Sequence, residues 1–185
     1  MAQTFLEEIG GDAIIEKVHT ILYDKLLSDP WLKHFFVGME RWHLEEQQTH
    51  FMSDLFGGSG SYHGRLPMNA HQHLFITEEV FMIRHRMLKE TLTQVRIPED
   101  QKGRWLQFDL GMKRALVKET IDDCEGRYRT EKVIAPPKPP GVCVANVKSF
   151  LNGNFRIYVF LAQHEFNSVS QLFYGWRLNN EGVHF

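Results

Sequence analysis

The sequence lacks two features that mark large classes of protein. It contains no run of about 18 apolar residues, the length that a membrane-spanning helix requires. It also has no excess of charge of either sign, since 21 Lys and Arg residues face 23 Asp and Glu residues and the formal net charge is -2. The composition therefore predicts neither a nucleic acid nor a membrane as a partner.

Cysteine is scarce, and the first residues lack an export signal. The two cysteines, Cys124 and Cys143, are far apart and have no closely spaced partner, so they fit neither a disulfide framework nor a zinc knuckle. We expect both to be free thiols. The opening MAQTFLEEIGG has neither the basic nor the apolar region of a signal peptide, which favours a cytoplasmic protein.

The chain changes in character near residue 120. Its 185 residues, 43% of them hydrophobic, suffice for one domain with a sizeable core and an additional segment at one end. We predict a domain over residues 1–120, a charged and Pro-rich linker over 121–140, and a C-terminal extension of unassigned structure over 141–185. The extension is rich in aromatic residues, and FRIYVFLA is typical of a strand. It could dock on the first domain, mediate self-association or have no function, and the oligomeric state is not predicted.

Residues 1–120 carry helical patterns almost throughout. Apolar residues three and four positions apart predict long helices near 12–28, 40–57, 78–95 and 98–116, with short segments near 30–36 and 68–74. Asp12 and Thr77 are suitable N-caps, and Gly57 can supply a left-handed helix end. No stretch here is a convincing strand, so the sequence predicts an all-α domain with short connections.

Two polar residues interrupt these apolar faces. Gln48 lies four residues after Leu44 and three before Phe51, which places an amide among apolar positions of one helix. Tyr23 lies beside Leu22, near the end of its own helix. Buried amides and phenols need hydrogen-bond partners. Either these two groups satisfy each other or a nearby carbonyl, or they face a small polar ligand, and the pattern alone does not choose.

Most of the ten histidines have ordinary explanations. Four lie at helical positions among polar neighbours, where we expect solvated or half-buried rings without a functional role: His19, His34, His43 and His50. His71 and His73 are two residues apart and would point in different directions on a helix. They lack the four-residue spacing that directs two imidazoles to one zinc ion.

The order of the motifs resembles that of the truncated haemoglobins, or two-over-two globins, and most of all their group I. Three stretches carry the resemblance: IGGDAIIEKVHTILYDKLLSDPWLKHFF, EEQQTHFMSDLFGGSGSYHGR and MNAHQHLFITEEVF. Together they extend over about residues 5 to 118. The resemblance implies a two-over-two helical sandwich and haem b (iron protoporphyrin IX) as cofactor.

The resemblance also implies roles for single residues. His71 matches the axial iron ligand, with His73 as its competitor, and Tyr23 and Gln48 match the residues that face bound oxygen. The remaining matches would contact the haem or line its pocket: Phe36, Leu44, Gln47, Tyr62, Met68, Ile76 and Phe81.

Four positions need separate comment. Arg84 lies where group I usually has an apolar side chain, and its guanidinium could reach solvent or a haem propionate. Arg65 and His63 are further propionate candidates. Gln47 replaces the basic side chain that can occupy the sixth iron position in group I, so the resemblance implies an open or water-bound sixth site.

The resemblance implies reversible binding of O2, CO and NO at a pentacoordinate ferrous iron. Reaction of bound O2 with NO to give nitrate would make Tyr23 and Gln48 catalytic, and would need an external reductase because the chain shows no flavin or nicotinamide motif. An alternative is a haem-based gas sensor or interaction module acting through the C-terminal segment. A third reading is a helical bundle without haem.

Overall fold

The computed structural model describes residues 3–60 and 62–141. Six α-helices and two 3₁₀ helices make up the regular structure of these residues. They are α1 (Phe5–Ile9), α2 (Asp12–Ser28), η1 (Leu32–Phe36), α3 (Arg41–Leu55), α4 (Pro67–His71), α5 (Glu78–Val95), α6 (Glu99–Leu116) and η2 (Ile121–Asp123). Apart from the helices, one isolated bridge joins Leu74 and Ile134 within the described range.

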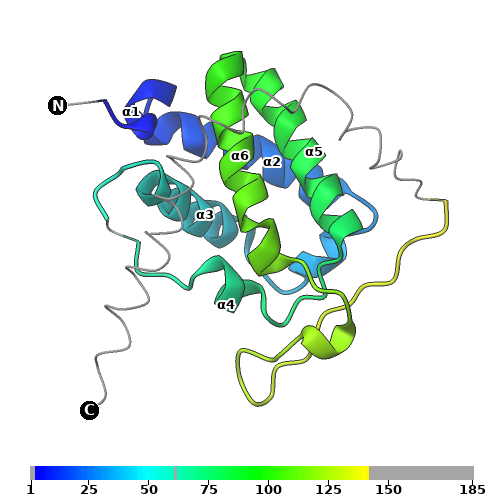
Figure 1. Ribbon diagram of the computed structural model, residues 1–185. Coiled ribbons are helices and arrows are strands. Elements are labelled where there is room, and N and C mark those ends of the chain that lie inside the picture. Colours follow the sequence, from blue (N-terminus) through cyan, green and yellow to red (C-terminus); the bar gives the residue numbers. More distant parts are fainter. Residues whose placement is uncertain (1–2, 61, 142–185) are drawn as a thin grey trace, which may run out of the picture. The chain divides into compact units, whose positions relative to one another are not determined.

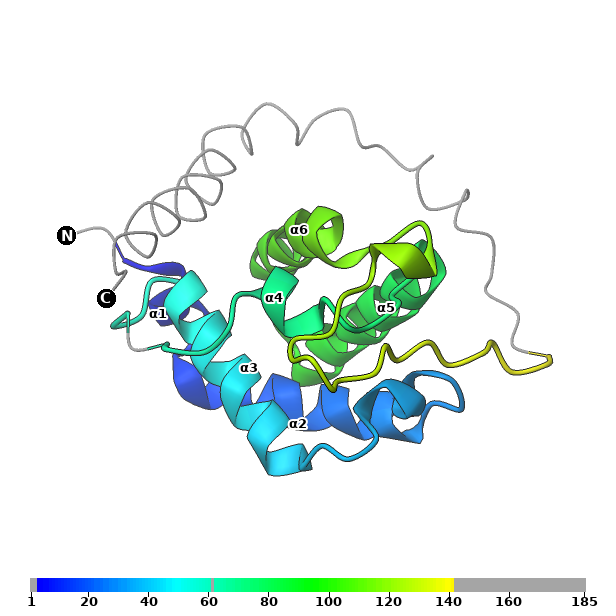
Figure 2. The ribbon, with the colours of Figure 1, turned by 90° about the horizontal axis from the view of Figure 1, so that it is seen from below.

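The long helices form two packed pairs. Helix α2 packs against α3 and α5, and α6 packs against α5 and α4 (Figure 1). Figure 2 shows α2 and α3 in one layer and α5 and α6 in the other. This arrangement confirms the predicted all-α, two-over-two helical sandwich. Side chains from both layers, such as Ile15, Leu22, Leu88 and Trp105, are almost completely buried between them.

Local hydrogen bonds explain where the helices begin. The carboxylate of Asp29 accepts hydrogen bonds from the backbone N–H groups of Trp31 and Leu32, both at 2.8 Å, and so starts η1. The Thr77 hydroxyl accepts one from Val80 N at 3.3 Å and caps α5, as predicted. Helix α1 was not predicted, although Thr4 and Glu7 form a reciprocal capping box at its start.

Residues 121–140, predicted to be a linker, lie against the globular body. They form most of a segment, residues 117–140, that we call the strap. Ile134 N donates to the His73 carbonyl at 2.8 Å, and Phe75 N donates to the Ile134 carbonyl at 2.9 Å. The indole of Trp31 donates to the Pro136 carbonyl at 3.0 Å. The strap is extended, but these bonds hold it in place, so it is not a free spacer.

Two predictions concern the part of the chain beyond the strap. The extension over residues 141–185, with its predicted strand, lies outside the described residues except for Gly141, and so does Cys143. Cys124 is a free thiol. No helix of the described segments has the length and apolar character needed to cross a membrane.

Candidate functional site

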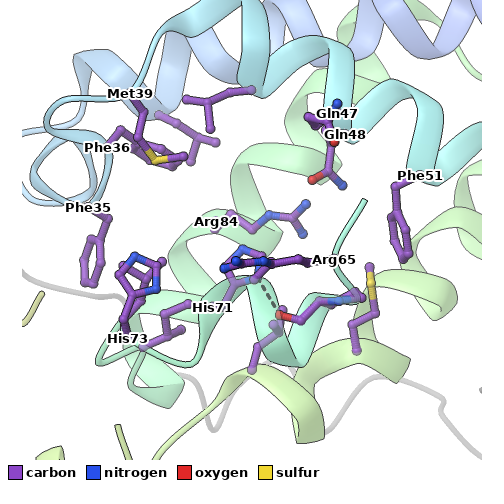
Figure 3. Close-up of a pocket in the computed structure, with 18 of the residues that line it drawn as sticks. Phe35, Phe36, Met39, Gln47, Gln48, Phe51, Arg65, His71, His73 and Arg84 are labelled. Atoms are coloured by element: carbon purple, nitrogen blue, oxygen red, sulfur yellow. Dashed lines mark hydrogen bonds between the residues drawn. The ribbon is translucent and has the colours of Figure 1, made fainter. Parts of the chain in front are cut away.

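A cavity of about 500 Å³ lies inside the helical sandwich (Figure 3). Its volume falls within the range of small-molecule and cofactor sites. Residues from α2, η1, α3, α4, α5, α6 and the strap line it. Nine of the ten residues to which the resemblance gives a role are among them: Tyr23, Phe36, Leu44, Gln47, Gln48, Tyr62, His71, Ile76 and Phe81.

Met68 is the exception. The structure leaves 59% of its side chain exposed, and it does not line the cavity. Within α4, the residues that do so are Pro67, Ala70 and His71, which follow one helical face. Met68 is offset from Pro67 by one position, about 100° around the helix, and points away. The structure therefore does not bring Met68 into the cavity with the other predicted residues.

His71 is held in one orientation and one tautomer. Its Nδ1 atom lies 2.7 Å from the Pro67 carbonyl oxygen, the bond dashed in Figure 3. Because a carbonyl oxygen only accepts, Nδ1 carries the proton and the Nε2 lone pair remains free. Burial lowers the pKa of His71 to about 4, so the ring is neutral at physiological pH. A neutral imidazole whose second nitrogen donates to a carbonyl is the usual state of a histidine that binds a metal.

His73 has a different environment, although it also lines the cavity. The residue is only 3% exposed, and its Nε2 atom lies 3.9 Å from a carboxylate oxygen of Glu131 in the strap. Its Nδ1 atom has no hydrogen-bond partner among the described residues. Nothing comparable to the His71–Pro67 bond fixes the ring, so the geometry favours His71 over His73 as a ligand.

Tyr23 and Gln48 offer uncommitted polar groups to the cavity. Tyr23 is 7% exposed and packs edge-on against Phe36, with ring centroids 5.9 Å apart. In the described part of the chain, neither the Tyr23 hydroxyl nor the Gln48 side-chain amide forms a hydrogen bond to another residue. The two groups therefore do not hydrogen-bond to each other. Burial raises the pKa of Tyr23 to about 12, which keeps the phenol protonated and able to donate.

Arg84 extends from α5 into the cavity rather than outward to solvent. Its Nη1 atom donates to Asp109 on α6, whose other carboxylate oxygen lies 2.7 Å from Nδ1 of His85. Asp109 is completely buried. In Figure 3 the guanidinium of Arg84 lies between the His71 imidazole and the Gln48 amide.

The strap adds cavity residues that sequence reasoning did not identify. Arg127 and Tyr128 both line the cavity. Arg65, which was a propionate candidate, also lines it; its Nη2 atom donates to the Tyr128 hydroxyl at 2.6 Å, and its guanidinium lies 4.7 Å from the centre of that ring. His63, the other propionate candidate, is not among the lining residues. No spacing in the sequence connects Arg127 and Tyr128 to Arg65, which lies more than 60 residues earlier in the chain.

The structure corrects the expectation for His19. Its side chain is 2% exposed, and its Nδ1 atom lies 2.8 Å from the Thr49 hydroxyl on α3. His19 follows Ile15 by four residues and Val18 by one, so it lies on the buried face of α2 despite its polar neighbours. Burial and, to a smaller degree, the charge of Arg84 lower the pKa of His19 to about 3.

Acid should therefore weaken the fold through His19. The folded-state pKa lies below the ordinary histidine value of 6.5, so the unfolded chain binds the proton first as the pH falls. Stability is then lost from about pH 6.5 downward, by at most about 1.4 kcal/mol per pH unit for this residue. Between pH 7 and pH 5, urea unfolding should show that wild type loses about 2 kcal/mol more than His19→Asn. If wild type and His19→Asn lose the same free energy of unfolding, His19 does not contribute to the pH dependence of stability.

A two-over-two helical sandwich that encloses an apolar cavity with an inward-facing histidine defines a truncated globin. The model of the bacterial-like globin family matches residues 4–119, and the chain belongs to this family.

The relatives agree with this assignment. Over 124 residues the chain is 26% identical to a group 1 truncated hemoglobin of Tetrahymena thermophila, a match that covers 67% of this chain and 96% of the relative. A group 1 truncated hemoglobin of Tetrahymena pyriformis is 36% identical over 70 residues, 38% of this chain and 58% of that one. A crystal structure of a variant truncated hemoglobin from T. pyriformis in its Fe(III) form is 25% identical, with a TM-score of 0.57, and covers 63% of this chain and 100% of that chain.

Membership of this family implies a haem globin that binds diatomic gases. The residues present fit such a group. The cavity is large enough for a cofactor, and one imidazole presents a free ring nitrogen to it. Aromatic and aliphatic side chains such as Phe36, Ile76 and Phe81 supply the apolar contacts.

Proposed function

We propose that this globin binds O2, and also CO and NO, reversibly at a pentacoordinate ferrous haem b. His71 would hold the haem iron through Nε2, and Tyr23 and Gln48 would face the bound gas. One observation carries the proposal: the Pro67 carbonyl fixes the His71 tautomer that leaves Nε2 free, inside a cavity that also contains a phenol with no hydrogen-bond partner among the described residues.

The haem supplies an iron centre that binds gases and transfers electron density toward O2. The protein side chains supply the selectivity among gases. The Tyr23 hydroxyl donates a hydrogen bond toward the polarised gas, and the Gln48 amide offers a second donor from α3. Hydrogen bonds to charged acceptors contribute about 1.5 to 3 kcal/mol. Gln47 has no basic group that could replace the gas, which favours an open sixth site. His43, a basic residue of the same helix, also lines the cavity but is exposed.

Conversion of O2 and NO to nitrate is a second reaction that this site suits. The same donors that hold O2 would keep it in place while NO enters. The conversion consumes one electron for each nitrate formed, so a separate reductase has to supply it. The sensor alternative depends on the C-terminal segment, which lies outside the described residues, and no observation favours it.

Reconstitution tests the proposal. We expect the apoprotein to take up one haemin per chain and to give a Soret band. After reduction it should give a spectrum that changes on adding O2 and returns when O2 is removed. Mixing the oxygenated protein with NO in a stopped-flow instrument should yield one nitrate per haem. A chain that stays colourless with haemin would contradict the proposal, and a nitrate yield near zero would contradict only the second reaction.

A further inference from the structure

The proposed gas-binding function leaves Arg84 unexplained. Neutral diatomic gases do not require a cation, and an arginine is costly to bury. We propose that Arg84, held by Asp109, makes the cavity a binding site for small inorganic monoanions beside the haem. This inference rests on the proposed function, because the anion would be the sixth ligand of the same haem.

The hydrogen bonding of Arg84 leaves donors available. A guanidinium has five N–H donors. Asp109 engages Nη1, while Nε and Nη2 make no hydrogen bond to any other described residue. The side chain of Arg84 is 24% exposed and that of Asp109 is 1% exposed. Since Arg84 lines the cavity, these donors face it, and the carboxylate lies behind the guanidinium.

The charges around the cavity favour an anion. Its described lining includes three arginines, Arg65, Arg84 and Arg127, and no aspartate or glutamate. Glu131 forms a salt bridge with Arg127 and so neutralises its charge, and the Tyr128 hydroxyl accepts a hydrogen bond from Arg65. The histidines of the lining are His43, His71 and His73. The positive charge of Arg84 is also felt by Tyr23 on α2. It lowers the pKa of Tyr23 and so opposes the rise that burial causes.

The position of Arg84 separates this role from propionate binding. A propionate extends from the haem edge and usually reaches solvent, and Arg65 is exposed enough to meet it there. Arg84 instead lies between the His71 ring and the Gln48 amide (Figure 3). A haem held by His71 and an anion bound to it would both lie in this interval. Asp109 and His85 limit the movement of the guanidinium, so its free donors stay directed at this interval.

Azide binding to the ferric, haem-loaded full chain tests the inference. Arg84→Met should weaken azide binding about tenfold, as expected for the loss of a charged hydrogen bond. Binding of neutral imidazole should change less than about twofold, and Arg84→Lys should retain part of the azide affinity. Arg41→Met is the matched control, because Arg41 pairs with Asp24 and Glu45 outside the cavity and its loss should leave azide binding unchanged.

A second variant guards against a folding defect. Arg84→Met leaves the Asp109 carboxylate buried without its cation, which is destabilising, whereas replacing both members of a buried pair is tolerated better. The double variant Arg84→Met, Asp109→Leu should fold and show the same azide defect. Unchanged azide affinity in either haem-loaded variant would overturn the inference, as would faster haem loss with normal azide binding. If wild type failed to take up haemin, the proposed function would fail and the inference with it.

Discussion

Replacing His71 with glycine should abolish the spectrum of a histidine-ligated haem, and added imidazole should restore it. The variant removes the ring whose Nε2 is free but leaves the Pro67 carbonyl, which accepts the hydrogen bond from Nδ1–H in the wild type. Free imidazole fits the vacated space and can donate to the same carbonyl. Absorption spectra of the ferrous and ferric forms, with and without millimolar imidazole, measure both effects. Recovery should approach the wild-type Soret position.

His73→Gly is the matched control for this experiment. His73 also lines the cavity, but its ring is buried beside Glu131 of the strap. We therefore expect the His73 variant to keep the wild-type spectrum and to need no imidazole. If instead the His73 variant loses the spectrum and the His71 variant keeps it, the axial ligand is His73 and the orientation argument from Pro67 is incorrect.

The fold could be predicted from local signals where those signals are complete. The α2 helix extends over Asp12–Ser28 as the spacing of its apolar residues indicates, and Thr77 caps α5 as predicted. The prediction that Asp12 is the N-cap of α2 is wrong, because the cap position is Gly11, which has no side chain to accept a hydrogen bond, and Asp12 is the first helical residue. The short α1 helix carries its own signal, a threonine followed three residues later by glutamate, yet five residues are too few for a periodic pattern. Its stability comes from burying Phe5 and Ile9 against later helices.

The site was predicted less completely, and the failures share a physical cause. His19 is judged from its polar sequence neighbours and Met68 from the family resemblance, but the burial of each depends on the helix faces that meet in three dimensions. Arg84 could be identified as a departure from the pattern, but its partner Asp109 lies 25 residues away on another helix. The contribution of the strap was not foreseen, because a Pro-rich segment carries no signal of the surface to which it binds.

Tyr23→Phe should speed O2 dissociation by about ten- to a hundredfold while changing CO dissociation by less than about threefold. The phenol is buried, protonated and without a partner among the described residues, so the gas is the acceptor that its hydroxyl can reach. Removing a hydrogen bond to a charged acceptor costs about 1.5 to 3 kcal/mol, which corresponds to that range of rates. Stopped-flow ligand replacement measures both dissociation rates on one sample.

The comparison of the two gases separates a hydrogen bond from a packing effect. Phenylalanine keeps the edge-on contact with Phe36, so a change in cavity shape would alter both gases alike. Bound CO is less polar than bound O2 and gains little from the donor, so only the loss of a hydrogen bond affects O2 selectively. Gln48→Leu should show the same selectivity with a smaller effect, because Tyr23 is the principal donor. Equal acceleration of both gases in the Tyr23 variant would assign the phenol a purely structural role.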